Sequence, residues 1–271
     1  MRIHIHICAC IVVSFLNEGD TKLCAQTLVP YVYVREADVM WSKRIWRVID
    51  LREKINLPFY YPLDDLPDRK SLFRIIQTGI NEGKILGVFE YDAFTNEFGA
   101  PLKSTEAKTR LTETIDVKDS VGSPLLDPLG NQVTMQESIK PERVVQYWIK
   151  EDWFFEKQRS VMEVRIIGIA PVIEIDDPVN GRYSYKPLFW LYYPGCRNYF
   201  SEFKSYNPYN DADWRNFDEI FHKRIFSSYI RQESNVYNRP ITAYALGEEA
   251  LFESGRIKEA IFKFEEDLWH Y

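Results

Sequence analysis

The chain contains little cysteine and little glycine. Of its 271 residues, only 4 are cysteines and 12 are glycines. Cys8, Cys10 and Cys24 all precede residue 26, so Cys196 is the one cysteine in the rest of the chain. Because a single thiol cannot form an internal disulfide, we expect a fold held together by its core and not by covalent cross-links.

The motifs that mark catalytic and metal sites are also missing. After residue 25 the histidines are His222 and His270, and neither has metal-ligand spacing. The sequence has no GxSxG elbow and no glycine-rich phosphate loop. Arg197 follows Cys196 and could activate the thiol, but a packed side chain is the simpler interpretation. We expect no catalytic residue, metal or cofactor, although a hydrolase whose carboxylates meet only in the folded chain stays open.

Positive charge is not in excess either. The chain has 34 lysines and arginines against 40 aspartates and glutamates, a net charge of -6 and an isoelectric point near 5.4. A nucleic-acid-binding protein usually has a basic face, so no nucleic-acid partner is expected. No apolar run approaches the roughly 20 residues that a membrane-spanning helix needs, so no direct membrane span is expected.

The first residues, MRIHIHICACIVVSFL, place one cation before a short apolar run. This order is typical of a secretory signal peptide, and Ala25 is a plausible last residue before cleavage. We therefore interpret residues 1–25 as a signal peptide and the rest as an exported protein. The alternative is a buried N-terminal strand.

Hydrophobic spacing predicts a helical lobe over residues 26–94. In residues 36–56, Trp41, Ile45, Val48 and Ile49 recur at helical intervals, which indicates an amphipathic helix. A second helix is expected after Ser71, which is a good N-cap residue. Residues 85–91 resemble a strand.

Residues 95–142 are polar and form a predicted insertion or linker, with a short helix near Lys108. Residues 143–271 are expected to form a second lobe. Its strands lie within 144–175 and 183–193, with an Asn-Gly hairpin turn at 180–181. Two helices follow, one capped by Asp211 or Asp213 and reaching Tyr229, the other over 256–269. The predicted fold class is α+β, with a mostly antiparallel central sheet.

Aromatic residues are abundant, at 15% of the chain. They interleave with cations along one predicted strand, and aromatic rings with arginine are common anchors of protein interfaces. The alternative is a sheet whose outer face is solvated. We predict that the following residues bind a partner: Trp148, Trp153, Phe154, Phe155, Lys157 and Arg159.

Several long runs resemble the GldN/PorN family of gliding-motility proteins. They include EADVMWSKRIWRVIDLREKIN at 36–56 and YWIKEDWFFEKQRSV at 147–161. Shorter matches occur at 188–190, 226–230, 233–237 and 266–271. The blocks cover most of the chain, but residues 95–142 show no such match.

The resemblance implies a periplasmic protein without catalytic residues, a component of the type IX secretion system. It further implies a large ring with an outer-membrane lipoprotein of the GldK/PorK type and contact with the periplasmic domain of a GldM/PorM motor protein. Association with the outer membrane would then come through the lipoprotein. The alternative function is a periplasmic ligand- or cargo-binding module, which would need an apolar pocket.

Overall fold

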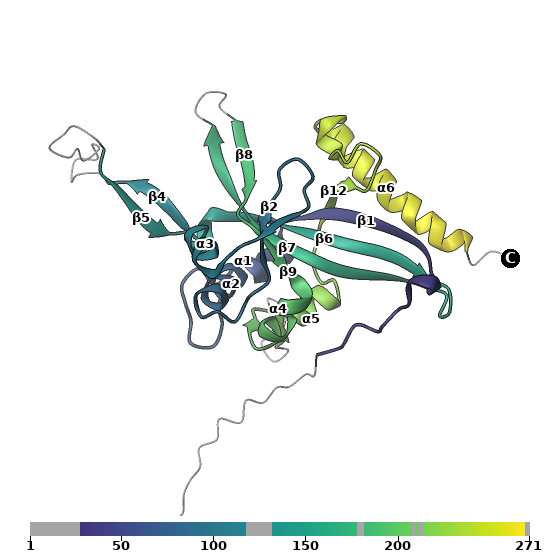
Figure 1. The fold of residues 1–271 in the computed structure, drawn as a ribbon, viewed down its shortest axis with the longest axis horizontal. Helices are drawn as coiled ribbons and strands as arrows, with labels where there is room; N and C mark the ends of the chain where they lie inside the picture. Colours follow the sequence, from purple (N-terminus) through teal and green to yellow (C-terminus); the bar gives the residue numbers. More distant parts are fainter. Residues whose placement is uncertain (1–27, 118–131, 178–181, 208–209, 211–213, 269–271) are drawn as a thin grey trace, which may run out of the picture.

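A computed structural model describes residues 28–117, 132–177, 182–207, 210 and 214–268. These residues form helices and a large antiparallel sheet, which confirms the predicted α+β class (Figure 1). The helices are α1 Leu57–Tyr60, α2 Leu72–Asn81, α3 Ser104–Thr109, α4 Tyr193–Ser201, α5 Phe217–His222 and α6 Glu248–Asp267. Short 3-10 turns lie at Glu36–Asp38, Lys54–Asn56, Pro141–Arg143 and Ile241–Ala243.

The strands of the main sheet follow the spatial order β12-β1-β6-β7-β9-β2-β3, with β8 paired to β7. Their bounds are β1 Val39–Asp50, β2 Val88–Tyr91, β3 Phe98–Pro101, β6 Val144–Glu156, β7 Val161–Asp177, β8 Arg182–Pro187, β9 Trp190–Tyr192 and β12 Tyr229–Glu233. Two separate ladders pair β4 Thr112–Asp116 with β5 Thr134–Ser138, and β10 Lys204–Ser205 with β11 Arg215–Asn216.

The predicted helix over residues 36–56 is wrong. Residues 39–50 form β1, which lies between β6 and β12 in the sheet. Every side chain from Ile45 to Ile49 is buried, so this segment has no solvated face. Periodicity cannot separate such a doubly buried strand from a helix, and the abundance of β-branched and aromatic residues favours the strand.

The predicted long helix that reaches Tyr229 is also wrong. Among the described residues of this segment, Phe217–His222 alone is helical, because Arg224 adopts a left-handed backbone (φ 55°) and Tyr229 already begins β12. The helix is capped by Asn216, whose side chain accepts a hydrogen bond from the amide of Glu219 at 2.7 Å. The predicted caps, Asp211 and Asp213, lie outside the described residues.

The predicted strand over residues 183–193 is two strands, β8 and β9, and its supposed end is the start of a helix. Pro194 lies in the first turn of α4, where a proline removes no helical hydrogen bond. β7 and β8 do pair as an antiparallel hairpin, as expected, although its Asn-Gly turn lies outside the described residues.

Other local predictions are confirmed. Ser71 caps α2 by accepting from the Arg74 amide, β2 lies within 85–91, and α3 contains Lys108. The last helix, predicted over 256–269, begins earlier, at Glu248, and ends at Asp267, and residue 269 lies outside the described residues. The lobe boundaries at residues 94 and 142 stay a prediction; β1 pairs directly with β6 across them.

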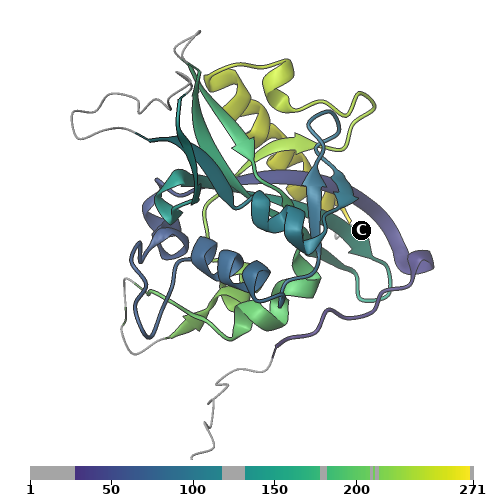
Figure 2. The same ribbon diagram turned by 60° about the vertical axis from the view of Figure 1, so that its left-hand side comes forward.

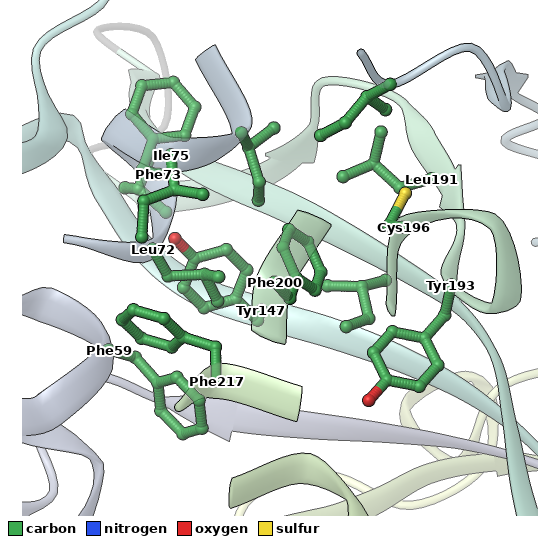
Figure 3. Packing of buried hydrophobic residues seen from close by; sticks show 14 of the residues in the cluster. Phe59, Leu72, Phe73, Ile75, Tyr147, Leu191, Tyr193, Cys196, Phe200 and Phe217 are labelled. Carbon is green, nitrogen blue, oxygen red and sulfur yellow. The ribbon is translucent and has the colours of Figure 1, made fainter. Parts of the chain in front are cut away.

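The largest core lies between the sheet and helices α1, α2, α4 and α5 (Figures 2 and 3). Phe59 stacks on Phe221 with ring centroids 5.1 Å apart, and Tyr147 of β6 packs close by. The described helices include none that is long and apolar enough to cross a membrane.

Candidate interaction surface

Three of the six residues predicted to bind a partner are buried within the chain. Trp148, Phe154 and Phe155 expose 2%, 7% and 5% of their surface. Arg231 lies over the Trp148 ring at 3.7 Å, and burial lowers the pKa of this arginine. These rings therefore stabilise the monomer and offer a partner little area.

The other three predicted residues are more accessible. Trp153 is half-buried, and its indole N–H donates to Oε2 of the fully buried Glu151 at 2.9 Å. Lys157 and Arg159 are exposed in the β6–β7 turn, where Arg159 pairs with Glu163 at 2.5 Å. The structure thus spreads the six along one strand and turn, and their binding role stays a prediction.

A buried cation on β6 fixes the connection between β2 and β3. Lys150 is 1% exposed, lies over the Phe98 ring at 4.4 Å and pairs with Glu97. Burial lowers the pKa of Lys150, and the bond to Glu97 opposes that shift. Because an unpaired buried charge is costly, the pair holds the β2–β3 connection against the sheet.

Asn96 connects that same loop to β12. Its backbone is left-handed (φ 54°), and its carbonyl accepts from the Trp46 indole at 2.9 Å. The Asn96 amide donates to Gln232 at 2.7 Å, and Gln232 donates to Asn238 at 3.0 Å. Asn238 in turn donates to the carbonyl of Thr95 at 3.1 Å. This closed network holds the β2–β3 loop beside the connection between β12 and α6 (Figures 1 and 2).

Large apolar side chains project from these two connected loops. Phe94 is 94% exposed, Val236 97%, Tyr237 77% and Leu246 76%. Isolated exposed apolar residues are normal, whereas contiguous exposed apolar patches are typical of interaction sites. We call this group the aromatic loop surface; it comprises Phe94, Val236, Tyr237, Arg239, Tyr244 and Leu246.

The loop that carries Tyr237 is fixed by its own side chains. The Asn235 carboxamide oxygen accepts from the amides of Tyr237 (3.1 Å) and Arg239 (3.2 Å). Arg239 lies between two rings, 5.1 Å from the centroid of Tyr237 and 4.9 Å from that of Tyr244. Tyr244 donates to Glu253 of α6 at 3.2 Å.

This arrangement suits protein binding. A partner that covers the rings gains apolar contact, and tyrosine with arginine is the usual composition of interface hot spots. Because the loop is already ordered, association costs less conformational entropy than it would for a mobile loop. Sequence reasoning missed this surface, although the run SNVYNRP contained a signal: two asparagines that favour turns flank a valine and a tyrosine.

One hollow among the described residues lies beside Ile55, Pro58 and Ile220 and is partly open to solvent. No group of three or more potential metal ligands occurs among the residues described. Burial raises the pKa of Cys196 to about 12, so Arg197 does not activate the thiol. Arg197 instead pairs with Asp218.

Residues 34–270 match the family described as "Gliding motility associated protein GldN". The chain belongs to the GldN family. The match includes β1, β6 and the aromatic loop surface, and it confirms the resemblance seen in the sequence. No curated protein matches the chain. This member of the GldN family is thus a gliding-motility-associated protein whose fold presents exposed aromatic side chains on two connected loops.

Proposed function

We propose that this GldN protein is a non-catalytic structural subunit of the type IX protein secretion and gliding motility apparatus. In this role it lies in the periplasm and forms a ring with an outer-membrane lipoprotein of the GldK/PorK type. It also contacts the periplasmic domain of a GldM/PorM motor protein. The lipoprotein attaches the ring to the outer membrane.

The aromatic loop surface is the observation that carries this proposal. Four apolar side chains at least 76% exposed are costly to keep in water unless a partner covers them. Because the chain belongs to a gliding-motility family, we look for that partner among the proteins of the gliding machinery. A ring needs a contact that is heterologous, with different surfaces meeting head to tail, and closes by rotation. The aromatic loop surface can supply half of such a contact.

Co-purification tests the proposal. The chain from residue 26 onward is mixed with the soluble part of the lipoprotein, and the product is sized by light scattering and electron microscopy. We expect a closed assembly far larger than either protein, which each protein alone does not form. Two proteins that remain small and separate contradict the proposal.

A further inference from the structure

The residues that precede β1 run along the body as an extended segment, which we call the N-terminal arm (residues 28–34). No helix or strand includes it. Val32 and Tyr33 are 54% and 86% exposed, whereas Tyr31 between them and the body is half-buried. Leu28 and Val34 at the two ends of the arm are half-buried as well, and Tyr31 is the half-buried residue at its centre.

Two arginines of the body receive that side chain. Arg197 lies 4.4 Å from the centroid of the Tyr31 ring and Arg165 lies 5.5 Å from it. The same arginines bond to the arm's backbone, with Arg197 donating to the carbonyl of Val29 at 2.7 Å and Arg165 to that of Val32. An aromatic ring and two flanking carbonyls are thus recognised together, which is how a peptide is recognised.

We call the site formed by Arg165 and Arg197 the socket, and both arginines also make contacts that do not involve the arm. Arg197 of α4 is 4% exposed and makes two bonds to Asp218 of α5, at 2.7 and 3.0 Å. Tyr193 donates to the same carboxylate at 2.8 Å. Arg165 of β7 lies over Phe154 at 4.8 Å and bonds to Glu163 at 3.1 Å. These contacts do not involve the arm, and they would hold both arginines in place after the arm leaves.

We propose that the pair Arg165 and Arg197 forms a separable docking site for the segment around Tyr31, and that in the assembly the arm of a neighbouring copy occupies it. An exchanged arm re-forms the same contacts, so exchange has little enthalpic cost. In the isolated chain the short tether gives the chain's own arm a high effective concentration, so this arm occupies the docking site in preference to the arm of another copy. Neighbours held side by side in the assembly present their own arms at a comparable effective concentration, so an exchanged arm competes with the chain's own arm. The exchange rests on the proposed ring; the docking site does not.

A peptide measurement tests the docking site. A fluorescent peptide of residues 26–36 is titrated onto full-length Tyr31→Ala protein, whose own arm lacks the ring that lies between the two arginines. We expect saturable binding at least about tenfold tighter than to the wild-type chain, whose socket is occupied. The same peptide carrying Tyr31→Ala serves as control and does not bind. If the intact peptide fails to bind folded Tyr31→Ala protein, the inference is overturned.

A photo-cross-link tests the exchange. Tyr31 is replaced by p-benzoylphenylalanine, and the protein is irradiated alone and with the lipoprotein. Alone, we expect cross-links within one chain, which leave its mass unchanged. In the assembly we expect covalent pairs of chains, with the link mapped to the segments around Arg165 or Arg197. Cross-links that stay within single chains in a fully formed assembly contradict the exchange. If no assembly forms, the proposed function fails, and the peptide measurement still decides the docking site.

Discussion

Strand β6 and the aromatic loop surface use the same residue types for opposite purposes. On β6, Trp148 is buried and covered by Arg231 at 3.7 Å. On the loop, Tyr237 is 77% exposed and lies 5.1 Å from Arg239. The two regions differ in what their polar contacts hold in place. Arg231 covers the Trp148 ring and completes the core, whereas the hydrogen bonds of Asn235 and Asn238 fix the loop backbone and leave the Tyr237 ring exposed. Composition alone therefore does not identify an interface.

The buried side of the comparison, Trp148 on β6, should show the largest effect on stability. Trp148→Ala removes a buried indole and leaves a cavity beside Arg231, so we expect a loss of about 3–5 kcal/mol in the free energy of unfolding. Urea denaturation followed by circular dichroism measures it. A loss below about 1 kcal/mol would show that Trp148 contributes little to the core.

The polar network beneath the surface should show an intermediate effect. Gln232→Ala leaves the side-chain NH2 of Asn96 and the side-chain oxygen of Asn238 without the bonds that they make to Gln232, so we expect a loss of about 1–3 kcal/mol in the free energy of unfolding. The loop should also become more mobile, visible as faster amide hydrogen exchange at 234–239. Unchanged exchange there contradicts the claim that this network orders the loop.

Cys196, which is buried in the core, gives a smaller, pH-dependent effect on stability. Its pKa is about 12 in the folded chain and near 9 when unfolded. The folded state therefore keeps a proton that the unfolded state loses, and stability from this thiol is full below pH 9 and declines as the pH rises toward 12. At pH 10 we expect wild type to lose about 1 kcal/mol relative to pH 8, a loss absent from Cys196→Ala. Equal losses in both proteins contradict burial of the thiol.

The aromatic loop surface should show the smallest effect on stability. Tyr237→Ser removes an exposed ring from an ordered loop, so we expect a change within about 0.5 kcal/mol in the free energy of unfolding. Thermal denaturation measures it. A loss above about 1 kcal/mol would mean that the ring supports the fold, and the contrast with Trp148 would disappear.

The sequence predicted what depends on local chemistry. Ser71 at the start of α2, Lys108 in a short helix and the β6–β7 strands all follow from capping and alternation. It failed at β1, because burial on both faces erases the alternation that marks a strand. The helix before Tyr229 also failed, because its end depends on the left-handed backbone of Arg224.

The candidate surface depended on contacts that no local pattern encodes. Gln232 and Asn96 are 136 residues apart, and their bond fixes which loops lie together. The predicted anchors Phe154 and Phe155 were plausible by residue type, yet tertiary packing buries both. Both rings lie on β6, which is paired with β1 on one side and β7 on the other. Because residues 36–56 were predicted to be a helix, the position of β6 inside the sheet was not predicted.

Assembly of a surface variant tests the account most directly. A triple variant, Phe94→Ser with Val236→Ser and Tyr237→Ser, is mixed with the GldK/PorK-type lipoprotein and sized. The matched control carries Leu86→Ser and Tyr183→Ser, two exposed positions outside the aromatic loop surface. We expect both proteins to fold, the control to form the large assembly, and the triple variant to remain small. A folded triple variant that assembles as well as the control would contradict the claim that this surface holds the protein to its partner.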